Sequence, residues 1–144
     1  MSASSVKLYW RQQLAAHHMQ KFADRELASV AKITTAQIGV LTVISNNKGI
    51  NQKEVALALG LNESAVTAMV RRLASLDLVK SSASKNDGRA KILALTATGR
   101  AVQKNAKLPF DKINKIIEST LSAGEIELLA ELLDRLKESF EEKL

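Results

Sequence analysis

The residues best suited to chemistry in this sequence are hydroxyl and guanidinium side chains that recur on one side of residues 62–76. A helical advance of about 100° per residue groups Ser64, Ala68, Arg71 and Ser75, flanked by Thr67 and Arg72. Arginine can donate two hydrogen bonds to guanine, and hydroxyl groups can contact phosphates or base edges. Small side chains let the helix backbone approach the bases closely. These residue types therefore predict a helix that lies in the major groove of duplex DNA.

The predicted contacts of this helix include its start as well as its polar face. A helix N-terminus offers a positive dipole end to a phosphate, and we expect Asn62 to cap it. The predicted DNA-binding residues are Asn62, Ser64, Ala65, Thr67, Ala68, Arg71, Arg72 and Ser75. The alternative is an ordinary solvated helix face. Surface helices usually mix both signs of charge, and the face predicted here has no acid, which favours the groove.

A second cationic cluster surrounds a predicted tight turn at Asn86-Asp87-Gly88. Apolar and small residues at 79–82 and 90–95 flank it, which predicts a β-hairpin because Asp-Gly supplies the positive φ angles of such turns. Arg89 is the candidate for insertion into a minor groove, with Asp87 on the same side to orient it. Lys85 and Lys91 would meet flanking phosphates. Read alone, the tip could equally be a solvated turn.

Capping signals divide the rest of the chain into helices. We expect a long helix over 6–29, then helices that begin at Thr34, Asn51 and Asn62, and a final helix from Ser122 to about residue 142. Gln37, Glu54 and Glu125 occupy the reciprocal capping-box positions of three of these starts. Another helix should begin at Thr96 or Thr98, and Pro109 should kink or break it.

The short helix from Asn51, its end at Gly60 and the helix from Asn62 together predict a helix-turn-helix. Asn51 and Gln52 would then contact the DNA backbone. A hairpin directly after the second helix would act as a wing. The fold class predicted is mainly α with a small β-hairpin wing, that is, a winged helix-turn-helix flanked by long dimerisation helices.

Composition and charge placement are consistent with a polyanionic partner. Residues 48–107 carry eleven Lys or Arg and four Asp or Glu, whereas residues 108–144 carry five and nine. The chain of 144 residues has a net charge of +6, 46% hydrophobic residues and no cysteine. Thiol catalysis, disulfides and cysteine-based metal sites are therefore excluded. No membrane span or apolar leader is evident, so we expect a cytoplasmic protein.

Three stretches, "TTAQIGVL", "NQKEVALALGLNESAVTAMVRRLASLDLVKSS" and "NDGRAKILALTATG", resemble the MarR family of winged-helix transcription regulators over about residues 34–100. The resemblance implies that Arg89 enters the minor groove, that Asp87 orients it and that the helix from Asn62 reads the major groove. Family members often have Gly where Asp77 stands and Arg where Ser81 stands. These departures leave the turn geometry and one cationic contact open.

The resemblance also implies a homodimer, with residues 1–33 and 100–144 for dimerisation and 34–99 for DNA binding. A two-fold dimer matches a palindrome with half-sites about one helical turn apart. The apolar residues of 122–142 form a stripe broader than one packing face needs, and Val6, Tyr9 and Trp10 lie near the other terminus. Packing of both helices within one chain is the alternative. The stripe comprises Ile126, Leu128, Leu129, Leu132, Leu133, Leu136 and Phe140.

Members of the family often release DNA when a small aromatic or phenolic ligand binds, but no motif here identifies an effector site. Trp10, Phe22 and the segment His17, His18, Met19 could line such a pocket. Alternatively, Trp10 and Phe22 belong to the core. Adjacent histidines point about 100° apart on a helix, which makes a poor metal chelate. We therefore expect no metal and no cofactor.

The function expected is sequence-specific binding of double-stranded DNA by a homodimeric repressor, with a small-molecule effector as a further partner. Enzyme motifs such as a phosphate-binding Gly-rich loop or Gly-x-Ser-x-Gly are absent from the sequence. The alternatives are a winged-helix module that binds protein and a non-specific duplex binder. The sequence does not indicate the operator, the regulated genes or the effector.

Overall fold

The computed structural model describes residues 3–84 and 91–144, with side chains from residue 7 onward. The described elements form two compact units, Met1–Pro109 and Phe110–Leu144. Their order is α1 (Ala3–Val30), α2 (Thr35–Asn46), α3 (Gln52–Leu59), α4 (Glu63–Ser75), β1 (Val79–Ala83), β2 (Lys91–Leu95), α5 (Ala97–Asn105), α6 (Lys107–Thr120) and α7 (Ala123–Glu141). The predicted fold class, mainly α with a β-hairpin, is confirmed.

Local hydrogen bonds explain why most helices begin where the sequence predicts. The side chains of Thr34 and Asn51 accept from the backbone nitrogens of Gln37 and Glu54, at 3.2 and 2.9 Å, and both capping boxes are closed reciprocally. Ser122 forms a third such box at the start of α7. Asn62 has the extended backbone of an N-cap, but its side chain makes no capping hydrogen bond, so that part of the prediction is wrong.

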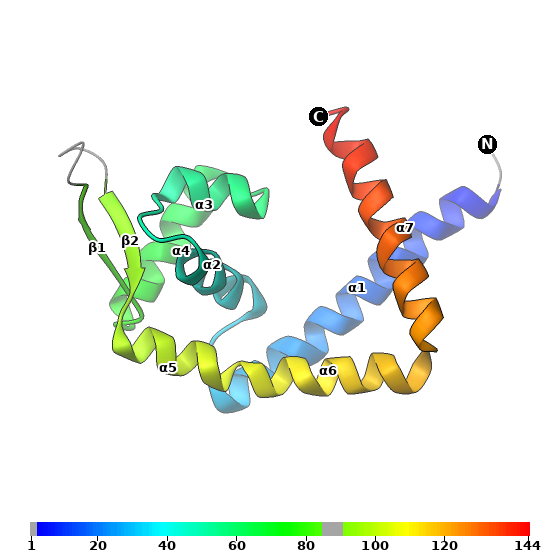
Figure 1. Cartoon of the computed structure of the whole chain (residues 1–144), viewed down its shortest axis with the longest axis horizontal. Coiled ribbons are helices and arrows are strands. Elements are labelled where there is room, and N and C mark those ends of the chain that lie inside the picture. The colour runs from blue at the N-terminus through cyan, green and yellow to red at the C-terminus, as the bar shows by residue number, and fades with distance from the viewer. Residues whose placement is uncertain (1–2, 85–90) are drawn as a thin grey trace. The chain divides into compact units, whose positions relative to one another are not determined.

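The core of the first unit lies between α2, α3, α4 and the hairpin, which Figure 1 shows gathered together. Its largest fully buried side chains are aliphatic, as the low aromatic content requires: Leu27, Leu41, Leu73, Leu93, Val40, Val55 and Val66. Val66, Val70 and Leu73 form the buried stripe of α4, on the side opposite the predicted DNA-binding face. Burial of this stripe fixes which face of α4 points outward.

The hairpin is antiparallel, with Val79 opposite Leu95 and Ala83 opposite Lys91. Its inward face is apolar near the core, where Val79, Leu93 and Leu95 are buried. Leu93 also donates from its backbone nitrogen to the oxygen of Ile50 at 2.8 Å, which attaches β2 to the loop between α2 and α3. The hairpin is therefore anchored at its base on the helix-turn-helix.

Two helix ends differ in how they reach the next element. Gly60 ends α3 with φ +64°, the left-handed conformation expected of glycine. Asn47, which ends α2, has φ −131°, and the positive φ of this connection is at Gly49, with φ +81°. Pro109 lies in the first turn of α6, where its missing N–H costs nothing, and the helix breaks before it at Ala106.

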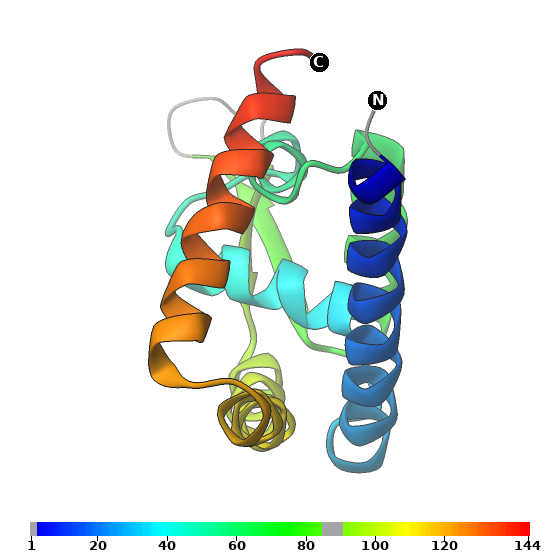
Figure 2. The ribbon, with the colours of Figure 1, turned by 90° about the vertical axis from the view of Figure 1, so that its right-hand side faces the viewer.

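The long N-terminal helix is continuous over its described length, as Figure 2 shows in blue. Its C-terminal part is fixed to the start of α2, because Asp24 accepts from the backbone nitrogen of Thr35 at 2.6 Å. None of the described helices is by itself long and apolar enough to cross a membrane. Lys7–Val30 and α2, which are bent by 75° relative to each other, reach the length and composition of such a span only when they are counted together.

Asp77 occupies the left-handed position that ends α4, with φ +57°. The nitrogens of Asp77 and Leu78 donate to the oxygens of Ala74 and Leu73, at 3.0 and 2.9 Å, the pattern of a Schellman motif. A Cβ in this conformation is strained, and glycine relieves the strain.

We expect Asp77→Gly to raise the free energy of unfolding by about 0.5–1 kcal/mol. Asp77→Ala should be less stable than the glycine variant by roughly 1–2 kcal/mol, because alanine keeps the Cβ and lacks a polar group for the turn. Urea denaturation of the three proteins measures both differences. Equal stability of the alanine and glycine variants would contradict a left-handed residue at this position.

Candidate nucleic-acid interface

The outward face of α4 carries the side chains that the sequence predicts for DNA. Arg71, Arg72 and Ser75 are exposed, as are the small or hydroxyl residues Ser64, Ala65 and Ala68. The face results from the buried stripe on the other side, since one apolar stripe on a helix leaves the opposite side to solvent. The structure therefore brings these predicted residues together on one surface.

The guanidinium groups of Arg71 and Arg72 have no hydrogen bond or ion pair to any residue that the structure describes. Ser75 differs, because its hydroxyl donates to the oxygen of Arg72 at 2.6 Å. One acid, Glu63, lies in the first turn of α4 beside the face. Two unpaired guanidinium groups on a surface with small neighbours are suited to bidentate contacts with an external acceptor.

Thr67 is placed differently from the rest of the face. It is half-buried, and its hydroxyl lies 2.9 Å from the amide oxygen of Gln52 at the start of α3. Asn51, the other predicted backbone contact, uses its side-chain oxygen to cap α3. The hydrogen bond between Gln52 and Thr67 was not apparent from the sequence, because the two residues are 15 positions apart.

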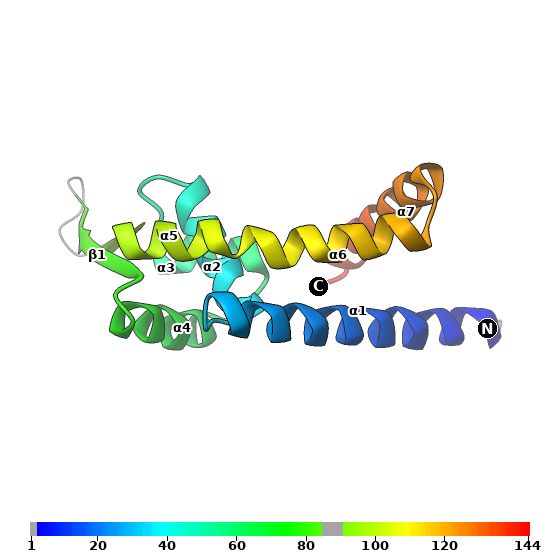
Figure 3. The same cartoon turned by 90° about the horizontal axis from the view of Figure 1, so that it is seen from below.

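The hairpin follows α4 directly, as Figure 3 shows where α4 leads into β1. Lys91, the first residue of β2, is exposed beside the tip. The remaining predicted tip residues, Lys85, Asp87 and Arg89, lie outside the described residues. Lys80 on β1 is a further exposed cation, missed in the sequence although it stands on the predicted first strand. Ser81, where an arginine is common in the family, is exposed opposite Leu93.

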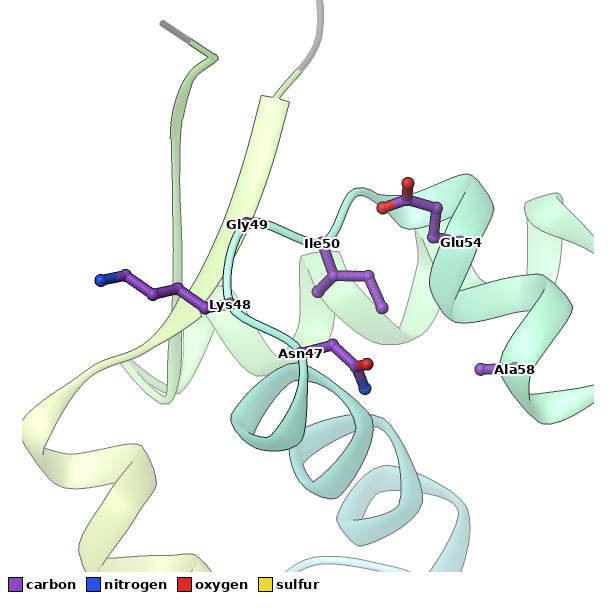
Figure 4. A pocket seen from close by; sticks show the side chains of 6 residues that line it. All are labelled: Asn47, Lys48, Gly49, Ile50, Glu54 and Ala58. Carbon is purple, nitrogen blue, oxygen red and sulfur yellow. The ribbon is translucent and has the colours of Figure 1, made fainter.

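A shallow pocket of about 540 Å³ lies beside the loop that joins α2 to α3. Figure 4 shows its lining, in which Lys48 points away from Ile50 and Ala58. The carboxylate of Glu54 is already used, because it accepts from the backbone nitrogen of Asn51 at 2.9 Å. These six lining residues, Asn47, Lys48, Gly49, Ile50, Glu54 and Ala58, therefore do not present converging groups to a ligand.

The residues considered for an effector pocket are separated along α1. A second pocket of about 260 Å³ takes in His17 with Gln20, Lys21 and Asp24, and none of the other candidates. Trp10 is 64% exposed, so its interpretation as a core residue is wrong for the single chain. His18 donates from Nδ1 to the oxygen of Leu14 at 2.8 Å, and its ring meets that of His17 edge to face.

Comparisons with known proteins are consistent with this geometry. The MarR family model matches residues 31–90, which begin directly after α1 and include α2, the helix-turn-helix and β1. The HTH-type transcriptional regulator MgrA of Staphylococcus aureus is 25% identical over 128 residues, covering 89% of this chain and 86% of MgrA. All these matched regions include α3 and α4.

Two of the solved structures that match cover more than nine-tenths of this chain. A MarR variant from Escherichia coli in complex with operator DNA superposes with a TM-score of 0.86 at 25% identity, covering 92% of this chain and 95% of that one. The PcaV regulator of Streptomyces coelicolor, in complex with its natural ligand, gives a TM-score of 0.75 at 25% identity, covering 91% and 89%. The hairpin and helix-turn-helix described above are thus shared with proteins of known fold.

Proposed function

Because this chain is a DNA-binding winged-helix regulator of the MarR family, we propose that it represses transcription as a homodimer on a palindromic site. The observation that carries the proposal is the exposed face of α4, directly followed by the hairpin. On this face two guanidinium groups without a partner among the described residues lie among small and hydroxyl residues. In this proposal Ser64, Ala68 and Arg71 meet base edges in the major groove. The tip of the hairpin, with Arg89, enters the adjacent minor groove.

The remaining predicted residues contact the DNA backbone. Lys85 and Lys91 meet phosphates on either side of the tip, and Asn51 and Gln52 meet a phosphate near the start of α3. Such contacts set position and orientation, whereas the face of α4 sets sequence preference. In this proposal residues 34–99 bind DNA, residues 1–33 and 100–144 form the dimer, and the protein acts on chromosomal DNA in the cytoplasm without catalysis.

Support for a dimer comes from the apolar surface of α7. None of its residues is buried, and its large apolar side chains are 40–64% exposed: Leu128, Leu129, Leu132, Leu133, Leu136 and Phe140. Leu8, Tyr9, Trp10 and Leu14 on α1 are 54–64% exposed. Apolar surface of this extent on a folded chain is characteristic of an interface. A second copy of the chain would cover it.

The dimer leads to a prediction for α7. We expect Leu132→Glu to raise the dissociation constant of the dimer by at least about 100-fold, roughly 3 kcal/mol, because each copy buries an unpaired charge. Ala130→Glu adds the same charge about 160° around α7 from Leu132, at the edge of the stripe, and should weaken the dimer far less. Sedimentation velocity at several concentrations measures both. If Leu132→Glu remains as dimeric as Ala130→Glu, this stripe is not the interface.

A small aromatic or phenolic effector that releases the DNA is the remaining part of the proposal. The complex of PcaV with its natural ligand supports it, since that regulator shares the fold. The exposed aromatic residues of α1 would be covered on dimerisation and could then enclose an apolar ligand.

The experiment that tests the proposed function is sequencing of DNA bound to the protein in cells, with and without candidate phenolics. We expect a short palindromic motif upstream of a limited set of genes, and higher transcription of these genes when the protein is deleted. Recovery of random DNA would contradict sequence-specific binding. Lower transcription after deletion would show an activator.

A further inference from the structure

The side chains of Gln52 and Thr67 join the two helices of the helix-turn-helix. Gln52 is the first residue of α3, and Thr67 lies one turn into α4. The Thr67 hydroxyl is 2.9 Å from the amide oxygen of Gln52, and both side chains are half-buried. This bond therefore acts at the point where the two helices approach each other, beside the face that is proposed to read DNA.

The Thr67 hydroxyl is held from a second direction as well. It also lies 2.9 Å from the backbone oxygen of Glu63, one turn earlier in α4. A hydroxyl has a single proton, so the two oxygens share it. The helix carbonyl fixes the side chain relative to α4, and Gln52 fixes it relative to α3. Together they restrain both the hydroxyl and the rotation of α4 about its axis.

The remaining hydrogen-bonding capacity of Gln52 is on its amide nitrogen. Its amide oxygen faces Thr67, whereas the nitrogen carries two donors and no acceptor. The neighbouring side chain of Asn51 is committed to capping α3 through its oxygen. At the start of α3, an amide donor is a suitable partner for a phosphate oxygen.

We propose that Gln52 is a positioning residue for base recognition, which fixes Thr67 and the rotation of α4 while its amide nitrogen binds a DNA phosphate. The inference rests on the proposed function, because it requires that α4 reads DNA. It assigns Gln52 a role in sequence preference beyond a backbone contact. A DNA phosphate that binds the Gln52 amide nitrogen would hold the amide oxygen toward Thr67. Binding to the DNA backbone and recognition of bases by α4 would then be coupled.

Thr67→Val and Gln52→Ala test the proposal, because each removes the bond without adding bulk. Binding to the operator duplex and to a scrambled duplex of equal length gives the preference for the operator. We expect each variant to lower this preference by about five- to tenfold, the value of one neutral hydrogen bond. The double variant should lose little more than either single variant, because both remove the same interaction.

Two conservative variants separate the roles of Gln52. Thr67→Ser keeps the hydroxyl and should recover most of the preference that Thr67→Val loses. Gln52→Glu keeps an acceptor for Thr67 but places a negative charge near the phosphate. It should weaken binding to both duplexes by a similar factor, so that the preference changes less than in Gln52→Ala. Thermal unfolding of each variant verifies that the protein is folded.

The outcomes distinguish this inference from the proposed function. In one contrary result, the wild type prefers the operator, but the losses of preference in Gln52→Ala and Thr67→Val add in the double variant. In another, Thr67→Val keeps the full preference. Either result shows that the positioning role of Gln52 is wrong and leaves the proposed DNA binding intact. If the wild type binds both duplexes equally, sequence-specific recognition fails and this inference fails with it.

Discussion

Gly99→Ala is expected to lower the free energy of unfolding by about 3 kcal/mol or more. Gly99 lies in the first turn of α5 and is buried. A Cβ at this position would overlap the carbonyl oxygen of Leu78 and lie 3.0 Å from its carbonyl carbon. The Leu78 oxygen cannot move away freely, because it accepts from the backbone nitrogen of Thr96 at 3.1 Å.

Hydrogen bonds of Thr96 connect the end of α4 to α5 beside this contact. Thr96 donates from its hydroxyl to the oxygen of Asp77 at 2.5 Å and accepts from the nitrogen of Gly99 at 2.9 Å. Displacement of Leu78 would therefore disturb Asp77 and the start of β1 together. We expect Gly99→Ala to lose DNA binding along with stability.

Gly124→Ala is the matched control, since a Cβ there meets nothing within 4 Å. It should be neutral or should stabilise α7 by up to about 1 kcal/mol, because alanine is the better helix former. Urea denaturation followed by circular dichroism compares the two variants with the wild type. If Gly99→Ala unfolds at the wild-type midpoint, the close approach of α5 to Leu78 is absent in solution.

Arg89→Ala is expected to weaken operator binding by about 1–3 kcal/mol per site, and by roughly twice that in a dimer with two hairpins. A narrow minor groove concentrates negative potential, and an inserted guanidinium gains from it. Arg89 lies outside the described residues, two positions before Lys91, which pairs with Ala83. Folding should be unaffected, which thermal unfolding can verify.

Two other arginines separate this role from general charge effects. Arg25→Ala removes the same charge from α1, where the side chain is 72% exposed, and should leave DNA binding nearly unchanged. Arg71→Ala should alter base preference, because Arg71 is assigned to the major groove. Fluorescence anisotropy on the operator and on its single-base variants measures these effects. If Arg89→Ala binds as well as the wild type, the minor-groove role is wrong.

The sequence predicts well those features that depend on neighbouring residues. Three capping boxes, Gly60 at the end of α3 and the buried stripe of α4 follow from local spacing, and all are present. Asn62 is the exception among the caps. Its reciprocal position holds Ala65, so no capping box can close there. The missing bond of Asn62 itself has no local explanation, because Thr96 caps α5 at Gly99 without any side-chain acceptor at that position.

Features that depend on distant residues could not be predicted. The bonds from Thr67 to Gln52 and from Leu93 to Ile50 join segments 15 and 43 residues apart, and nothing local specifies them. The exposure of Trp10 likewise depends on what packs against α1, which its own spacing does not indicate. The pairing of β1 with β2 was predictable because an Asp-Gly pair between two short strand-like segments is a local signal. The DNA-binding roles of its residues stay predictions.

The salt dependence of operator binding tests the central claim most directly. If α4 and the two hairpins of a dimer grip adjacent grooves, cations on the protein displace counterions from several phosphates. The logarithm of the binding constant should then fall linearly with that of the salt concentration, with a loss of roughly 10³ to 10⁵ between 50 and 200 mM salt for about 6–10 phosphate contacts. An operator affinity that barely changes over this range, or no binding to duplex DNA, would contradict the account.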